Sequence, residues 1–213
     1  VAKEILHLSD QVKKVLHDTV TVVKENQMQG VDKIQEESAK VTKLTDKITD
    51  YLAGLFSSGL LTEQQASQTA GLMYVLGDVD RIGNLSAGIA LSMKEKETNQ
   101  YKYSQEAMDE LAKCLKTLEK MFDSATKALR GDTTVELEKL MKRKDKIVNL
   151  DIMMRKSHIQ RVNKGKCKAS LTTPFTNILH LIDRMGNSCI NLADAATNEV
   201  ALKYFLPKDE MTM

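Results

Sequence analysis

The sequence predicts an all-α fold of six helices, arranged as two tandem pseudo-repeated three-helix bundles. Three observations support this prediction. The 213-residue chain has no Trp and only two Pro and four Phe, whereas helix formers such as Lys, Glu, Leu, Ala and Met are frequent. Apolar residues recur at helical spacing along most of the chain. The motif Asp-Arg-x-Gly-Asn occurs at residues 80–84 and again at 183–187, which indicates an internal duplication.

The first half of the chain predicts three helices. Helical spacing of apolar residues favours a first helix over about residues 3–28, with a break near Gly30. A second helix is expected over residues 32–56, before the Ser-Ser-Gly sequence that follows. Thr62 and Gln65 have the spacing of a capping box, which satisfies free amides at a helix start, so a third helix should begin there.

The second half repeats this plan. A fourth helix should begin near Ser104 and end by Gly131, and the sequence Asp-Thr-Thr at 132–134 is expected to cap a fifth helix that reaches residue 163. Pro174 suits the first turn of a sixth helix, which is expected to continue to about residue 205. Because short connections favour antiparallel packing, residues 1–98 and 99–213 should each form one three-helix repeat.

Composition excludes several classes of function. The net charge of +2 and the lack of aromatic residues among the basic ones argue against a nucleic-acid partner. The three cysteines show no Cys-x-x-Cys spacing, which fits a reducing compartment and argues against a disulfide framework. No apolar run reaches the ~18 residues that a membrane span needs, and no signal peptide is visible. Because the chain begins at Val1 rather than Met, we interpret it as a fragment. Whether membrane segments precede it is left open.

Polar residues four apart recur at matching places in both halves. Side chains at this spacing lie on one face of a helix, where their oxygen atoms can bind a cation or simply be neighbours in water. In the first half 34 residues separate Asp46 from Asp80, and in the second half 38 residues separate Asp145 from Asp183. Antiparallel packing of the two helices can therefore bring the two pairs of each half face to face. The pairs are Asp46 and Asp50, Asp80 and Asn84, Asp145 and Asn149, and Asp183 and Asn187.

With the run His158-x-x-Arg161-x-x-x-Gly165-x-Cys167, these repeated motifs resemble the PhoU family, and most closely the PhoU-type domain at the C-terminus of bacterial sodium/phosphate cotransporters. The resemblance covers about residues 5–205 and implies two tandem three-helix bundles. It also implies a regulatory role in phosphate uptake, exercised on the cytoplasmic side of the membrane. The implied partner is the membrane portion of a phosphate transporter or a phosphate-signalling protein.

The resemblance also implies a candidate metal site, because some family members hold iron or zinc clusters on their acidic pairs. The cofactor here would then be a divalent metal or iron, held by the eight paired residues. Asn84, Asn149 and Asn187 depart from the family pattern, and a neutral amide oxygen is a weaker ligand for iron or zinc than a carboxylate. The first half keeps three carboxylates and is the better candidate. The other interpretation, which we favour, is that the pairs are solvated residues inherited from a metal-binding ancestor.

The residues between the paired positions have structural interpretations. Arg81 and Arg184 could bind phosphate through the planar guanidinium, but an ion pair that fixes helix packing is the favoured interpretation. Gly83 and Gly186 each cost about 1 kcal/mol of helix propensity relative to Ala, which close approach of a neighbouring helix would offset.

His158 and Arg161 lie one turn apart, and His158 is interpreted as a hydrogen-bonded structural residue. No Ser, Cys or acidic residue stands at a spacing that suggests nucleophilic catalysis, so the chain is predicted not to be an enzyme. Residues 131–170 are rich in Lys and Arg, which indicates a solvated helix face or, alternatively, contact with anionic lipid or an acidic partner.

The function expected from these observations is that of a cytosolic PhoU-like regulatory domain of a sodium-dependent phosphate transporter, acting through helix-bundle contacts. A free-standing PhoU-type adaptor of phosphate transport and signalling is the alternative, and a metal-binding helical module is a third hypothesis. A homo-oligomer is left open.

Overall fold

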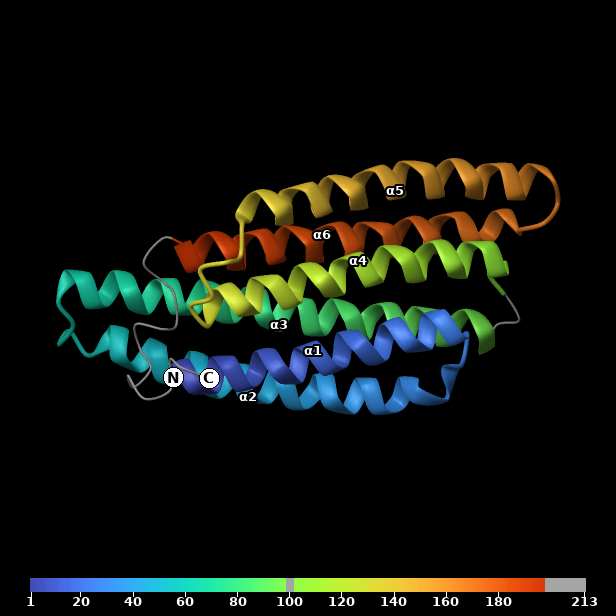
Figure 1. The fold of residues 1–213 in the computed structure, drawn as a ribbon. Helices are drawn as coiled ribbons and strands as arrows, with labels where there is room; N and C mark the ends of the chain where they lie inside the picture. Colours follow the sequence, from blue (N-terminus) through green and yellow to red (C-terminus); the bar gives the residue numbers. More distant parts are fainter. Residues whose placement is uncertain (99–101, 198–213) are drawn as a thin grey trace.

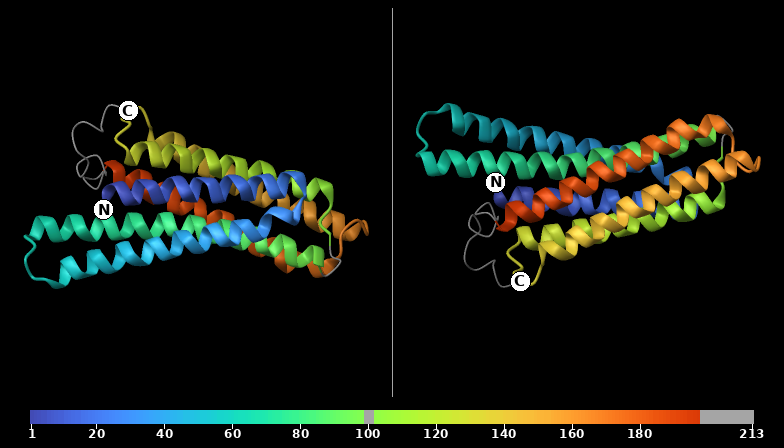
Figure 2. Two further views of the ribbon diagram at one scale, coloured as in Figure 1. Left: turned by 90° about the horizontal axis from the view of Figure 1, so that it is seen from below. Right: turned by 90° about the horizontal axis from the view of Figure 1, so that it is seen from above.

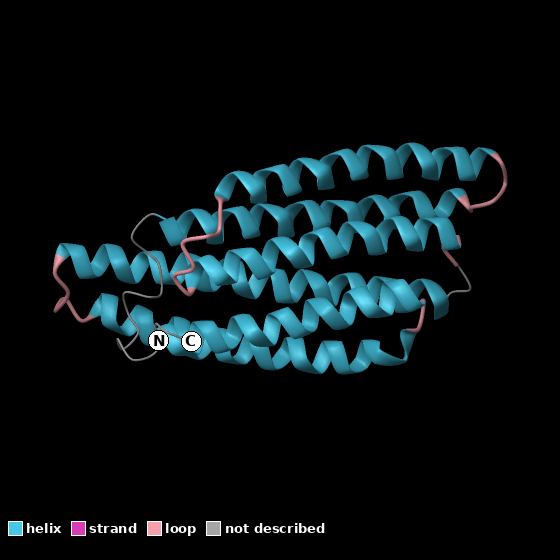
Figure 3. Cartoon of the chain, viewed as in Figure 1, coloured by secondary structure: helices cyan, strands magenta, loops and turns pink. Residues whose placement is uncertain are grey.

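The computed structural model describes residues 1–98 and 102–197, and within these ranges it contains six long α-helices (Figures 1 and 3). This confirms the predicted fold class. Two short 3₁₀ helices, η1 (Met28–Gly30) and η2 (Ala169–Leu171), precede the second and last of them. The α-helices are α1 (Ala2–Glu25), α2 (Val31–Ser57), α3 (Glu63–Thr98), α4 (Gln105–Leu129), α5 (Leu137–Asn163) and α6 (Thr172–Thr197).

The helices form two repeats that share one core. Within the first repeat α1, α2 and α3 pack on one another, and α4, α5 and α6 do the same in the second. Helix α1 also packs on α4, and α3 packs on α6, so these four helices form the centre of the molecule (Figures 1 and 2). Helices α2 and α5 lie on opposite outer sides, where each covers two helices of its own repeat. One cluster of buried apolar residues extends through both repeats.

Local signals explain several helix ends. Helix α1 ends before Asn26, which adopts a left-handed conformation with φ of 52°, three residues earlier than the sequence suggested. The capping box at the start of α3 is present: the Gln65 amide donates to the Thr62 hydroxyl at 3.2 Å, and the Thr62 amide donates to Gln65 Oε1 at 2.9 Å. Ser104 caps α4 by accepting from the Ala107 amide at 3.2 Å.

The predicted start of the fifth helix was wrong. Helix α5 begins at Leu137, because Asp132 forms a local turn in which its Oδ1 accepts from the Thr134 amide at 2.9 Å and from the Thr134 hydroxyl at 2.6 Å. Pro174 lies in the first turn of α6, as expected. The predicted end of the sixth helix near residue 205 lies outside the described residues. The predicted domain boundary adjoins residues 99–101, which are also outside them, and it stays a prediction.

Candidate functional site

In the first repeat, the pair formed by Asp80 and Asn84 lies on α3 and faces a row of hydroxyl groups on α2. Asn84 Nδ2 donates to Asp80 Oδ2 at 2.9 Å, so the two side chains share one face of the helix. The Thr45 hydroxyl donates to Asp80 Oδ1 at 3.1 Å. The hydroxyls of Ser38 and Thr42 both donate to Asn84 Oδ1, each at 3.1 Å. The result is a seam of oxygen atoms between the second and third helices of the first repeat.

Asp80 is the half-buried carboxylate of this seam. Burial raises its pKa above the ordinary value, and the nearby charge of Asp46 acts in the same direction, while hydrogen bonds from Thr45 and Asn84 oppose the shift. The ionised carboxylate is therefore held at some cost in solvation.

The other two predicted ligands of the first repeat, Asp46 and Asp50, lie exposed on α2. Among residues 1–98 and 102–197, no three His, Cys, Asp or Glu side chains gather closely enough to hold a metal ion. The first repeat thus offers one half-buried carboxylate, one amide and several hydroxyls. Hard cations accept such oxygen ligands, so this donor set is a closer match to a hard ion than to iron or zinc.

In the second repeat, the corresponding pair, Asp183 and Asn187 on α6, has different surroundings. The ammonium of Lys144 on α5 pairs with Asp183 Oδ1 on α6, and the Lys144 side chain is only 15% exposed. Its stem covers Gly186, since a Cβ added there would lie 2.8 Å from Lys144 Cδ. Lys144 directly precedes Asp145 in the way that Thr45 precedes Asp46, so an ammonium stands where the first repeat has a hydroxyl.

This lysine changes what the second repeat can bind. An ammonium only donates hydrogen bonds, and here it already supplies the positive charge beside Asp183. The other predicted ligands of this repeat, Asp145, Asn149 and Asn187, are all exposed. The second donor set therefore does not fit a metal ion. Sequence reasoning missed Lys144, because nothing in its local pattern distinguishes it from the other lysines of α5.

The motif arginines have different surroundings. Arg81 forms an ion pair with Asp78 at 2.9 Å, and the hydroxyl of Ser188 on α6 donates to the same Asp78 Oδ1 at 2.7 Å. This cluster joins the two repeats. Arg184 is exposed.

Gly83 lies where three helices of the first repeat meet. A Cβ added there would lie 3.1 Å from Val12 Cγ2 of α1 and 3.5 Å from Val41 Cγ1 of α2. The close approach expected from the sequence is therefore present at this position.

The His158–Cys167 run closes the loop after α5. His158 is buried, stacks on Phe175 with ring centroids 4.9 Å apart, and its Nε2 lies 2.9 Å from the Thr172 hydroxyl. Arg161 is also buried and donates to Glu110 Oε2 at 3.1 Å, while its backbone carbonyl accepts from the Cys167 amide at 3.2 Å. These contacts hold the run against α4 and α6.

The titration of this run argues against catalysis. Burial lowers the pKa of His158, and the charge of Arg161 lowers it further, so the imidazole stays neutral. Cys167 Sγ lies 3.8 Å from His158 Nδ1, but burial raises the pKa of the thiol. A thiol of raised pKa next to a neutral imidazole is a poor nucleophile.

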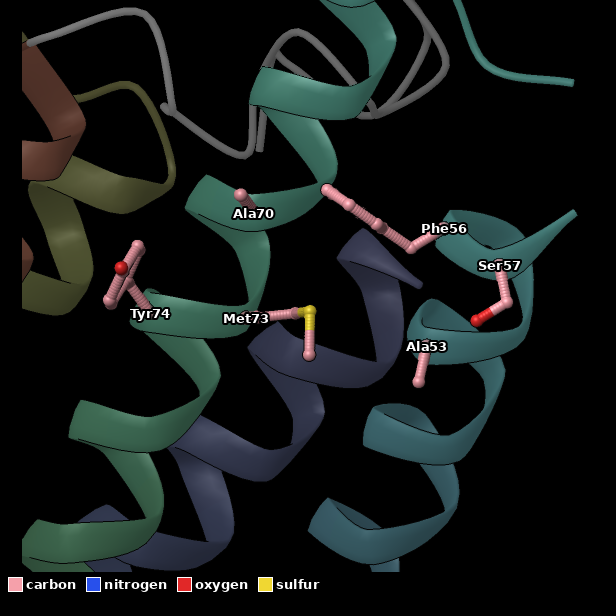
Figure 4. A pocket seen from close by; sticks show the side chains of 6 residues that line it. All are labelled: Ala53, Phe56, Ser57, Ala70, Met73 and Tyr74. Atoms are coloured by element: carbon pink, nitrogen blue, oxygen red, sulfur yellow. The ribbon is translucent and has the colours of Figure 1, made fainter. Parts of the chain in front are cut away.

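An apolar groove lies between the C-terminal end of α2 and the N-terminal part of α3 (Figure 4). In this region the first repeat extends beyond the other helices (Figure 1). The volume of the groove is about 540 Å³, and the side chains of Phe56 and Met73 extend into it. Phe56 is 50% exposed and Tyr74 is 78% exposed. Clustered exposed apolar side chains of this kind are typical of interaction surfaces.

Among the described residues, no helix has a stretch that is long and apolar enough to cross a bilayer.

Two tandem three-helix repeats that share a core, each with a polar pair on its last helix, define a duplicated helical-bundle protein. The sequence matches the PhoU domain twice, over residues 5–93 and 111–196. The chain therefore belongs to the PhoU domain family. This membership confirms the prediction that the chain is not an enzyme.

Solved structures show the same fold. The crystal structure of PhoU from Pseudomonas aeruginosa matches with a TM-score of 0.77 and 13% sequence identity, covering 91% of this chain and 92% of that one. The phosphate transport system regulatory protein PhoU from Streptococcus pneumoniae matches with a TM-score of 0.72 and 16% identity, covering 92% of this chain and 90% of that one. At these identities the likeness concerns the fold alone. Among curated protein sequences there is no significant match.

Proposed function

We propose that this chain is a PhoU-type regulator of phosphate transport that acts through protein contacts. The observation that carries the proposal is the duplicated PhoU domain, which accounts for both repeats and all six helices. The Streptococcus protein with this fold is a phosphate transport system regulatory protein. The exposed apolar groove between α2 and α3 supports a role exercised by binding a partner.

Of the two forms that the sequence suggested, the free-standing adaptor has the stronger support. The two PhoU proteins are matched over 92% and 90% of their own lengths, so this chain corresponds to nearly the whole of each. The cotransporter-domain form rests on the resemblance of the His158–Cys167 run and of the Asp183–Asn187 motif that follows it. The native sequence upstream of Val1 distinguishes the two, because apolar spans of about 20 residues there would indicate a transporter domain.

An affinity capture experiment tests the proposal. The tagged chain is purified from membranes of its native host, grown with abundant and with scarce phosphate, and bound proteins are identified by mass spectrometry. We expect subunits of a phosphate transporter, or a phosphate-signalling protein, to be enriched over a tag-only control. If no phosphate-transport or phosphate-signalling protein is enriched in either medium, the proposed partner class is wrong.

A metal role is a second candidate function, and we propose it for the first repeat only. Asp80, Asn84 and the hydroxyls of Thr42 and Thr45 supply oxygen ligands, whereas the ammonium of Lys144 pairs with Asp183 in the second repeat. Metal analysis by plasma mass spectrometry on protein purified without chelator tests this. Bound metal should fall in Asp80→Ala and stay unchanged in Asp183→Ala. Less than a tenth of an equivalent in the unmodified protein would exclude the metal role.

A further inference from the structure

Five lysines from three helices surround one groove, which is lined by α4 and α5 of the second repeat and by the end of α1. The groove has a volume of about 360 Å³ and lies along α4, between the end of α1 and the middle of α5. Among the described residues that line it, Asp109 is the one acidic residue, and Ala112 and Thr117 are neutral. The lysines are Lys24 on α1, Lys113, Lys116 and Lys120 on α4, and Lys146 on α5.

Three carboxylates of α4 that do not line the groove form ion pairs with residues outside it. Glu119 accepts from His17 Nδ1 at 2.6 Å, and Asp123 pairs with Lys13 and with Lys127. Glu110 pairs with Arg161 at 3.1 Å. By contrast, none of the five groove lysines forms an ion pair with another residue in the described part of the chain. Asp109 is therefore the one carboxylate among the described lining residues, against five lysines, and the groove keeps an excess of positive charge.

The arrangement on α4 concentrates this charge. Lys113, Lys116 and Lys120 follow one another at three- and four-residue spacing, so their side chains form a row on one face of the helix. Like charges at this spacing repel one another, and an anion bound along the row would relieve the repulsion. The row extends over about 10 Å of helix, which is longer than a single phosphate ion needs.

We propose that this groove binds an oligophosphate anion, that is, several linked phosphate groups carried by one small molecule. Lysine ammonium groups are compact point charges that bind phosphate without the planar geometry that arginine imposes. No aromatic residue of the described part of the chain lines the groove, so these residues offer no stacking platform for nucleic-acid bases. A concave groove of this volume holds a small anion better than it contacts the broad surface of a lipid headgroup layer. The proposal is independent of the role in phosphate transport.

Titration calorimetry with inorganic tripolyphosphate tests the proposal, with orthophosphate as the single-phosphate comparison. Tripolyphosphate should bind at least about tenfold more tightly than orthophosphate, and its affinity should fall as salt is added, because exposed charges are screened. It should also raise the melting temperature of the protein. The double variant Lys116→Gln/Lys120→Gln should lose about tenfold or more in affinity.

A matched control separates the groove from general charge. Lys139 and Lys142 on α5 pair with Glu136 and Glu138 and lie outside the groove, so Lys139→Gln/Lys142→Gln removes the same charge elsewhere. This variant should bind tripolyphosphate like the unmodified protein. Equal losses in both double variants, or no binding of tripolyphosphate at low salt, would overturn the proposal. So would binding to vesicles rich in phosphatidylserine that tripolyphosphate fails to displace, since that outcome assigns the lysines to a membrane surface.

Discussion

At the scale of single residues, the two repeats differ at the position directly before Asp46 on α2 and directly before Asp145 on α5. Thr45 donates a neutral hydrogen bond to Asp80, whereas Lys144 places a full charge beside Asp183. The repeat with Thr45 therefore has a row of oxygen atoms, whereas in the other repeat the ammonium of Lys144 neutralises the charge of Asp183.

Variants of Lys144 should show that its stem and its charge contribute separately. Lys144→Met keeps most of the apolar stem over Gly186 but removes the charge, and we expect it to cost about 1 kcal/mol because Asp183 is partly exposed. Lys144→Ala also loses the packing of the stem and should cost roughly 1 kcal/mol more. Urea unfolding at neutral pH measures both. Equal stability of the two variants would contradict the packing role.

His158 should make stability depend on pH. Its folded-state pKa is lowered by burial, so the neutral form is favoured in the folded protein, and protonation favours the unfolded chain. Stability should therefore fall as pH decreases through the unfolded pKa of about 6.5, by up to about 1.4 kcal/mol per pH unit until the folded pKa is reached.

Comparison of unfolding at pH 7.5 and 5.5 in the unmodified protein and in His158→Gln isolates this contribution from the other histidines. The variant should lose less stability on acidification. An identical loss in both proteins would mean that His158 does not titrate as inferred.

At the scale of the elements, Gly83 sets how closely α3 approaches α1 and α2. A larger side chain has no room beside Val12 and Val41, so Gly83→Leu should destabilise the protein by about 1–3 kcal/mol through overpacking. Gly88, on the same helix, has no atom within 4 Å of an added Cβ. Gly88→Ala should therefore stabilise by about 0.5–1 kcal/mol through helix propensity. Thermal unfolding measures both, and equal melting temperatures of the two variants would contradict the close approach.

At the scale of the whole molecule, the two repeats are joined by α1 on α4 and by α3 on α6. The Ser188 hydroxyl donates to the buried Asp78 across the second of these contacts. Because one apolar core extends through both repeats, we expect unfolding to be a single cooperative transition. Ser188→Ala should shift that transition by about 1–2 kcal/mol, since Asp78 would lose one of its two partners.

Hydrogen exchange under increasing denaturant tests this cooperativity in both repeats at once. Peptides from α2 and α5 should lose protection together, and Ser188→Ala should move both by the same amount. Loss of protection in one repeat well before the other would show that the repeats unfold independently.

The sequence predicted the elements better than their association. Helical spacing, the capping box at Thr62 and the repeated motif depend on local residues, so six helices and a duplication were visible. The pairing of Lys144 with Asp183 and the lysine groove depend on helices that meet only after folding. The start of α5 was predicted wrongly at Asp132, because an Asp side chain can either cap a helix or close a turn, and here it closes a turn.

Uptake of radiolabelled phosphate by the native host is a direct test of the proposed role in phosphate transport. The gene is deleted and then restored on a plasmid, and initial uptake rates are compared in phosphate-rich and phosphate-poor medium. If the chain is a regulator of phosphate transport, deletion should change the rate several-fold in at least one medium, and the restored gene should return it to the original value. Unchanged uptake in both media would show that the chain does not regulate phosphate transport, whatever the groove or the acidic pairs are found to bind.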